Sequence, residues 1–384
     1  MPAAPAPIVV VAPDSFKGSL DAPAICAAIA RGLRRVWPAA EVRACPMADG
    51  GEGTLDAVLS RGGDRRVRNI TGAGGKVRAA AYGIVAAPEG ATAIIEAAEI
   101  VGITDPDGMA TGVTARSTRG IGELIAALLD TGVRRFMIGL GGSSTNDGGA
   151  GMLVALGLKL VDATGRDIAP TPEGLASLAL VDAQGLDPRL ALSSITIMSD
   201  VNNPLCGERG ATAIFGPQKG VRADEIAAID ATLARYAALA ERAKGTRAAD
   251  RPGAGAAGGL GFALQLVGGT FRSGAEVVAD LIGLDAALAG ADWAFAGEGR
   301  TDAQTLLRKA PYVVAERARA AHVPITLLSG AVDAAALPEL GHVFDGCFAL
   351  PSGPMTLADC IANADLLLAD RAEQIARIWD AARR

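Results

Sequence analysis

Residues 8–36 read IVVVAPDSFKGSLDAPAICAAIARGLRRV, and they contain the pattern on which the fold assignment depends. The apolar run Ile8–Ala12 is typical of a buried strand. A polar turn, Pro13–Gly18, follows it, and from about Ser19 to Val36 apolar residues recur at helical spacing. This succession of strand, polar loop and helix is the βα unit of parallel-sheet proteins.

The same succession occurs at four further places in the chain. In each, an apolar run leads into a loop of Gly, Asp, Ser or Asn: Glu41–Pro46 before Met47–Gly53, Arg135–Gly139 before Gly141–Gly149, Ile195–Ser199 before Asp200, and Asp292–Ala296 before Gly297–Asp302. Ligands of α/β folds collect at the carboxyl ends of parallel strands. These five loops are therefore the predicted functional region.

The composition agrees with an α/β fold. Half of the residues are hydrophobic but only 4% are aromatic, so the cores must be built from aliphatic side chains, as in helices packed on parallel sheets. A chain of 384 residues predicts two domains. Short alternating strands at Val77–Ile84 and Thr92–Glu96 indicate where the chain leaves the parallel sheet.

We therefore predict a discontinuous Rossmann-like, doubly wound domain from residues 1–68 and 274–384, and a central inserted α/β domain of mixed sheet from residues 69–273. Lys244–Gly259 is rich in Gly, Ala, Arg and Pro and has no apolar period, which predicts a mobile loop or the edge of a lid. A final helix is expected from about Thr356 to Arg384.

The net charge, the cysteines, the histidines and the N-terminal stretch argue against several classes of protein. A net charge of −6 with scattered Lys and Arg argues against nucleic-acid binding. The five cysteines have no CxxC pair and are expected to be reduced thiols. Two histidines offer little for a His triad or a His-rich metal site. The N-terminal stretch lacks a basic region and a long apolar core, so a cytoplasmic protein without membrane attachment is expected.

The densest candidate is Gly139–Gly151, thirteen residues with six glycines. Glycines let backbone N–H groups approach an anion, and the positive end of the following helix would add to the attraction. This loop is a predicted phosphate cradle rather than a flexible turn, and its proposed binding residues are Gly141, Gly142, Ser143, Ser144, Thr145 and Asn146. It is not a P-loop, because the required Gly-Lys pair is absent from it.

Asp14, Ser15 and Lys17 follow the first strand, where a carboxylate and a mobile ammonium could meet substrate or phosphate. We assign Asp14 and Ser15 to binding and Lys17 to charge neutralisation during catalysis. The alternative is a helix-capping loop with Ser19 or Asp21 as the cap.

Two loops supply candidate metal ligands. Asp49 and Glu52 offer hard oxygen ligands in a glycine-rich loop, as Mg²⁺ bound to a nucleotide requires, although Glu52 could instead cap a helix. The loop Gly297–Asp302 contains Glu298, Arg300 and Asp302. The Arg300 guanidinium suits a carboxylate or phosphate, and Asp302 is a further candidate for the metal.

The loop after Ile195–Ser199 supplies the candidate base. A phosphoryl acceptor needs a carboxylate that orients its hydroxyl and takes the proton, and Asp200 has this position; an Asx turn before Pro204 is the alternative. Asn203 and the downstream Lys219 are candidate binding residues.

Seven segments, spread over nearly the whole length, resemble the bacterial glycerate kinase family of the galactarate and glyoxylate pathways. They are APDSFKGSL (12–20), MADGGEGT (47–54), GLGGSSTNDGGAGM (139–152), SDVNNPLCG (199–207), FGPQKG (215–220), GAAGGLGFAL (255–264) and GEGRTDAQT (297–305). The resemblance implies two α/β domains, ATP and Mg²⁺, and phosphorylation of D-glycerate, usually at the 2-hydroxyl. The family usually has glycines where this chain has Arg308 and Val313.

Loops and resemblance together predict in-line transfer of the γ-phosphoryl group of ATP to D-glycerate in the interdomain cleft, giving 2-phospho-D-glycerate. A homodimer is compatible with the sequence. The rival functions are a kinase of another small sugar acid, a nucleotide-binding oxidoreductase, and a catalytically silent glycerate sensor. An oxidoreductase is disfavoured because this chain has no GxGxxG motif after the first strand, where Asp14-Ser15-Phe16-Lys17 stands instead.

Overall fold

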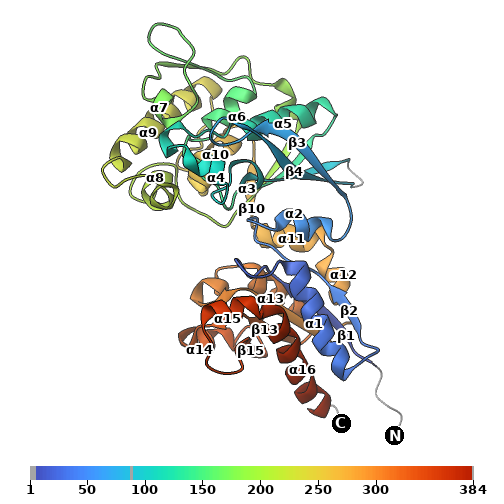
Figure 1. Ribbon diagram of the computed structural model, residues 1–384. Coiled ribbons are helices and arrows are strands. Elements are labelled where there is room, and N and C mark those ends of the chain that lie inside the picture. Colours follow the sequence, from blue (N-terminus) through green and yellow to red (C-terminus); the bar gives the residue numbers. More distant parts are fainter. Residues whose placement is uncertain (1–5, 87–89, 383–384) are drawn as a thin grey trace. The chain divides into compact units, whose positions relative to one another are not determined.

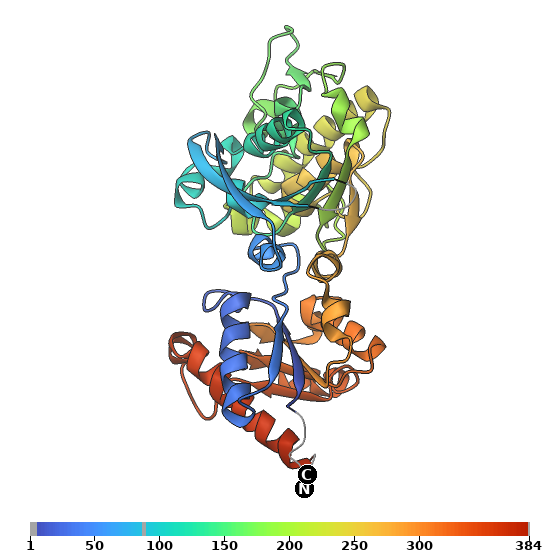
Figure 2. The ribbon, with the colours of Figure 1, turned by 90° about the vertical axis from the view of Figure 1, so that its right-hand side faces the viewer.

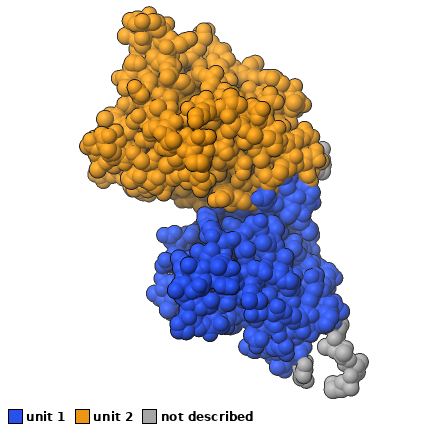
Figure 3. All heavy atoms as spheres, viewed as in Figure 1, with its two compact units in different colours: residues 1–49, 56–62, 273–384 blue, residues 50–55, 63–272 orange. Residues whose placement is uncertain are grey.

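The computed structural model (Figure 1) describes residues 6–86 and 90–382, and these residues form two compact units. Unit 1 comprises residues 1–49, 56–62 and 273–384, and unit 2 comprises residues 50–55 and 63–272 (Figure 3). The first five residues, and the last two of the expected C-terminal helix, lie outside the described part. The domain boundaries that we expected at 68/69 and 273/274 stay a prediction.

Unit 1 is built on a five-stranded parallel sheet with the order β15-β13-β11-β1-β2. Its strands are β1 (Ile8–Pro13), β2 (Glu41–Ala44), β11 (Trp293–Gly297), β13 (Ile325–Ser329) and β15 (Gly346–Ala349). A separate two-stranded ladder pairs β12 (Arg300–Thr301) with β14 (Ala331–Val332). Numbered along the chain, the main order is 2-1-3-4-5, one of the two common doubly wound arrangements.

Helices cover both faces of this sheet, as Figure 2 shows for the blue and red helices on one side and the orange ones on the other. On one face, Val9 and Val11 pack with Ile25, Leu33 and Leu368. The unit 1 helices are α1 (Ala22–Val36), α11 (Gly274–Leu281), α12 (Leu284–Leu288), α13 (Ala310–Ala320), α14 (Leu337–Leu340), α15 (Leu357–Ala362) and α16 (Ala364–Ala382); α2 (Thr54–Leu59) spans both units. The parallel α/β architecture predicted from residues 8–36 is confirmed.

Close packing explains one glycine in α1. An added Cβ at Gly32 would stand 2.1 Å from the backbone oxygen of Ala369 in α16, so only glycine allows these helices to approach so closely. Helix α1 begins after Asp21, whose carboxylate accepts the N–H of Ala24 at 2.8 Å. The predicted start at about Ser19 was three residues early, and Asp21, one of the two caps considered, is the actual cap.

Unit 2 contains a six-stranded mixed sheet with the order β10-β9-β6-β5-β4-β3. Strands β5, β6, β9 and β10 are parallel, and β3 and β4 add an antiparallel edge. The strands are β3 (Asp64–Thr71), β4 (Val77–Val85), β5 (Thr92–Glu96), β6 (Arg135–Gly139), β9 (Ser194–Met198) and β10 (Thr270–Arg272). A separate antiparallel pair is formed by β7 (Lys159–Val161) and β8 (Leu180–Asp182). The mixed sheet expected of the central region is confirmed.

The helices of unit 2 surround one large aliphatic core. They are α3 (Ala97–Val101), α4 (Pro106–Ala110), α5 (Arg119–Asp130), α6 (Ala150–Ala155), α7 (Pro172–Leu175), α8 (Ala211–Phe215), α9 (Ile226–Lys244) and α10 (Ala256–Leu266). In the described part of the chain no helix combines the length and apolar character needed to cross a membrane.

The prediction of a mobile loop at Lys244–Gly259 was wrong. Ala248 and Ala254 are fully buried in the core of unit 2, and the N–H of Gly255 donates to the backbone oxygen of Asn203 at 2.9 Å. Gly258 has a left-handed φ of 66°, and a Cβ there would stand 2.0 Å from the oxygen of Thr145. Glycine and alanine occur here because two backbone segments meet closely, not because the chain is loose.

Candidate functional site

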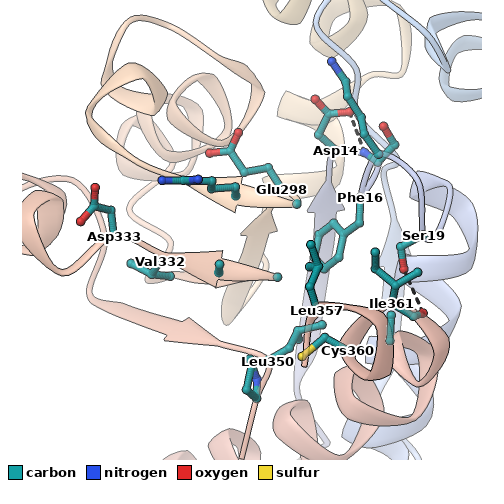
Figure 4. A pocket seen from close by; sticks show the side chains of 18 of the residues that line it. Asp14, Phe16, Ser19, Glu298, Val332, Asp333, Leu350, Leu357, Cys360 and Ile361 are labelled. Carbon is teal, nitrogen blue, oxygen red and sulfur yellow. Dashed lines mark hydrogen bonds between the residues drawn. The ribbon is translucent and has the colours of Figure 1, made fainter. Parts of the chain in front are cut away.

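Unit 1 contains a pocket of about 890 Å³ at the carboxyl ends of its parallel strands. Figure 4 shows Asp14 and Glu298 at one end and Leu350, Leu357, Cys360 and Ile361 at the other, with Phe16 between them. Strands β1 and β11 are neighbours, and the chain leaves them toward opposite edges of the sheet, so this is the topological switch point where such folds bind ligands.

Asp14 lies directly after β1 at this switch point and is nearly buried. Its Oδ1 accepts the N–H of Ser15 at 2.6 Å. Burial, and then the negative charge of Asp49, raise the pKa of Asp14 to about 7. Ser15 and Asp49 also line the pocket, so the structure brings the first two predicted loops together.

Glu298 follows β11 and is the carboxylate that sequence reasoning noticed but left without a role. Its Oε1 accepts the hydroxyls of Thr301 at 3.0 Å and Thr305 at 2.5 Å. Burial raises the pKa of Glu298, while these two hydroxyls lower it. The threonines in GEGRTDAQT were the available signal, since a buried carboxylate needs donors.

Cations and carboxylates share the pocket. Lys17, Arg300 and Lys309 all line it, so two of the three predicted catalytic residues are in one place. Asp302 does not line it: this residue caps a short 3-10 helix, Ala303–Leu306, by accepting the N–H of Gln304 at 2.8 Å. The metal role of Asp302 stays a prediction, but its carboxylate already has a structural partner.

The candidate metal ligands are divided between the units. Asp49 belongs to unit 1 and lines the pocket, whereas Glu52 belongs to unit 2 and is exposed. Within residues 6–86 and 90–382, no three His, Cys, Asp or Glu side chains form a group able to hold a metal ion. Asp14 and Asp49 are nevertheless close enough for one charge to raise the pKa of the other, and two such carboxylates suit Mg²⁺ that also binds phosphate oxygens.

Unit 2 contains a second, smaller pocket of about 300 Å³. Its polar wall includes Gly141, Gly142, Ser143, Ser199, Gln218 and Lys219. The Lys219 side chain is buried, and its Nζ donates to the Ser143 hydroxyl at 3.1 Å and to the Thr145 backbone oxygen at 2.8 Å. Burial lowers the pKa of Lys219 to about 7. Lys219 thus contacts the glycine-rich loop directly, and its role in binding stays a prediction.

The other polar residues of that loop point into the protein. Ser144 donates to the backbone oxygen of Val101 at 2.9 Å, and Asn146 donates to the hydroxyl of Thr212 at 3.0 Å. Ser144, Thr145 and Asn146 are completely buried and do not line the pocket. Their direct contact with phosphate stays a prediction, while Gly141, Gly142 and Ser143 face the pocket.

Asp147 occupies the start of helix α6, where we expected the phosphate. Its Oδ1 accepts the N–H of Gly149 at 3.1 Å, and its Oδ2 accepts the N–H of Gly151 at 3.1 Å. Thr118 donates its N–H and its hydroxyl to the same Oδ2, at 2.7 and 2.8 Å. The positive end of this short helix is thus already neutralised by a buried carboxylate.

Arg116 is a second residue that sequence reasoning missed. It is 3% exposed and donates to the backbone oxygens of Ser144 at 3.0 Å and Lys219 at 2.9 Å. It thereby joins the glycine-rich loop to the segment that carries the buried lysine. No local signal marks Arg116, because it follows no strand and lies in an ordinary polar stretch.

Asp200 and Asn203 follow β9. Asp200 is exposed and stands between Ser199 and Val201, which line the unit 2 pocket. Asn203 is half-buried and donates to the backbone oxygen of Arg209 at 2.8 Å, which closes the turn before α8. The catalytic role of Asp200 and the binding role of Asn203 stay predictions, and Asn203 has a structural hydrogen bond.

Both units have an α/β fold with a pocket that combines at least one cation with hydrogen-bonding groups, as in an enzyme. A profile of the glycerate kinase family matches residues 9–380. The chain is 39% identical to glycerate kinase of Bacillus subtilis, covering 96% of both chains, and 38% identical to glycerate 2-kinase of Escherichia coli, covering 93% of both. The chain belongs to the glycerate kinase family, as its motifs indicated.

A solved structure from Salmonella typhimurium LT2, assigned as a glycerate kinase 2, has the same fold. It superposes with a TM-score of 0.85 at 40% identity and covers 99% of this chain and 100% of its own. Arg308, one of the two positions where the resemblance led us to expect glycine, adopts a left-handed φ of 64°. Its guanidinium extends to Glu276 and Glu316 and does not line the unit 1 pocket.

Proposed function

We propose that this enzyme phosphorylates D-glycerate with ATP and forms 2-phospho-D-glycerate. The observation that carries the proposal is the combination, in one pocket, of three cations with four carboxylates: Lys17, Arg300 and Lys309 with Asp14, Asp49, Glu298 and Asp333. Cations that neutralise phosphate oxygens and carboxylates suited to Mg²⁺ are the parts that phosphoryl transfer requires. The similarity to a glycerate 2-kinase supports the choice of acceptor and of its 2-hydroxyl.

We assign the residues as follows. Asp49 and Asp14 would hold Mg²⁺, which when bound neutralises phosphate charge. Lys17 and Arg300 bind the oxygens of the transferred phosphoryl group. Lys219 and Ser143 bind the glycerate carboxylate in the unit 2 pocket, and Asp200, beside that pocket, takes the hydroxyl proton.

A coupled assay of ATP consumption with D-glycerate tests this function, and phosphorus NMR of the product identifies the isomer. We expect turnover with D-glycerate and a 2-phosphate signal. Faster turnover with another sugar acid would make that acid the substrate, and a 3-phosphate product would correct the regiochemistry. Absence of ATP consumption with D-glycerate and with every other small sugar acid tested would contradict kinase activity.

The KM for glycerate is expected to rise with pH above about pH 7. Burial lowers the pKa of Lys219 to about 7, so the free enzyme loses this positive charge as the pH rises through that value. The negative charge of Asp147 raises the pKa of Lys219, and the positive charge of Arg116 lowers it further. The KM should rise by up to about tenfold per pH unit.

Steady-state kinetics between pH 6 and 9 measure this effect. The Lys219→Met variant is the control: its KM should be high and independent of pH, because the titrating group is absent. A wild-type KM that stays constant over the range would exclude Lys219 as the carboxylate ligand.

A further inference from the structure

The unit 1 pocket is too large and too apolar for glycerate or for phosphate groups alone. Its volume of about 890 Å³ falls within the range of pockets that enclose drug-sized ligands. Glycerate is a three-carbon acid with no substantial apolar surface. A second, larger ligand with both apolar and anionic parts is needed to account for the whole pocket.

The pocket has two chemically different ends (Figure 4). Asp14 and Glu298 lie at one end; the charges of Asp49 and Lys17 act on Asp14, that of Lys309 acts on Glu298, and Arg300 is two residues from Glu298. The other is formed by Phe16, Leu350, Met355, Leu357, Cys360 and Ile361. We call these six residues the apolar end.

Three of the six residues of the apolar end are unusually exposed for their type. Leu357 is 77% exposed, Ile361 40% and Met355 39%, and all three border the same cavity. A cluster of large apolar side chains in contact with water, beside a well-formed cavity, indicates a surface that a ligand covers. Phe16, which is buried, adds an aromatic ring at the junction of the two ends.

We infer that the apolar end binds the purine base of ATP, so that unit 1 holds the nucleotide with its triphosphate directed to the cationic end. This inference rests on the proposed function, which supplies ATP as the phosphoryl donor. A purine has two flat apolar faces that match the apolar end, and the anionic triphosphate attached to it matches the cationic end. The cations at the far end, Lys17, Arg300 and Lys309, suit phosphate oxygens.

The assignment divides the substrates between two pockets. The smaller unit 2 pocket, with Lys219 and Ser143, is left for the three-carbon acid. The glycine-rich loop, which the sequence suggested as the main phosphate cradle, then contributes to the acceptor site rather than to the nucleotide site.

The test is a double variant, Leu357→Ser with Ile361→Ser, which removes apolar contact without adding charge. Binding of ADP to the resting enzyme, measured calorimetrically without glycerate, should weaken by about tenfold or more. Binding of inorganic tripolyphosphate should not change, because it has no base. The matched control is Leu366→Ser with Ile378→Ser, two exposed residues of α16 that do not line the pocket, and it should bind ADP as the wild type does.

A measurement on the unsubstituted protein gives a second, independent result. Cys360 stands in the apolar end and is half-buried, so a maleimide can react with it and peptide mass spectrometry can follow the reaction. ADP at a concentration that nearly saturates the pocket should slow the alkylation of Cys360 by at least about fivefold, because the bound nucleotide covers the thiol. Tripolyphosphate should leave it unchanged.

The outcomes separate this inference from the proposed function. Unchanged ADP binding in the double variant, or equal loss for ADP and tripolyphosphate, would overturn the base-binding assignment even if the enzyme phosphorylates glycerate. Absence of glycerate turnover with normal, Leu357-dependent ADP binding would overturn the proposed function and leave the nucleotide site. Absence of ADP binding to the wild type would overturn the nucleotide site directly.

Discussion

The Asp147→Asn variant is expected to lose about 2–5 kcal/mol of unfolding free energy, although the two side chains have almost the same size. Asp147 is completely buried, and all four groups bonded to it are donors: two from Thr118 and the N–H groups of Gly149 and Gly151. A carboxylate accepts at both oxygens, but an amide accepts at one and donates at the other. In either orientation the amide would direct its NH₂ at an N–H group.

Urea unfolding of the purified variant, followed by circular dichroism, measures this loss. The control is Asp182→Asn, whose carboxylate accepts the N–H of Gln184 in an exposed turn and which should change stability by less than about 1 kcal/mol. Equal stability of the two variants would contradict the structural role of Asp147. Because Asp147 positions the loop that carries Ser143, the variant should also lose glycerate affinity.

Local sequence was sufficient for the architecture of unit 1. Ile8–Ala12 is a continuous apolar run, and such runs form strands buried on both faces of a parallel sheet. The polar residues after each run had to lie at one edge, since all strands of that sheet point the same way. The grouping of Asp14, Lys17, Asp49 and Arg300 in one pocket was predictable for this reason.

The interior of unit 2 was not predictable in the same way. Lys219 and Arg116 are charged residues in polar stretches, which normally indicate solvent exposure. Both are nevertheless buried, because backbone oxygens of distant segments accept hydrogen bonds from them. The run from Lys244 to Gly259 has the composition of a flexible loop, and only the nearby Thr145 backbone explains why glycine is needed at position 258. Such facts depend on contacts between segments far apart in the sequence.

The Asp200→Asn variant is expected to lose about 10²- to 10⁴-fold in kcat, with a KM for glycerate close to that of the wild type. Asp200 lies two residues after the end of β9, between two residues of the pocket that we assign to glycerate. An amide there can still hold the acceptor hydroxyl by a hydrogen bond, but it cannot take the proton. Steady-state kinetics of the purified variant with saturating ATP measure the two parameters separately.

The division between kcat and KM decides the role of Asp200. A raised KM with an unchanged kcat would make it a binding residue, because that pattern reports lost ground-state affinity, and a near wild-type kcat would remove it as the base. Asp230→Asn is a suitable control, because this carboxylate accepts the N–H of Gly207 in the same loop but does not line the pocket. If Asp230→Asn lost as much kcat as Asp200→Asn, the loss would come from a displaced loop, whereas a loss confined to Asp200→Asn assigns the proton transfer to that carboxylate.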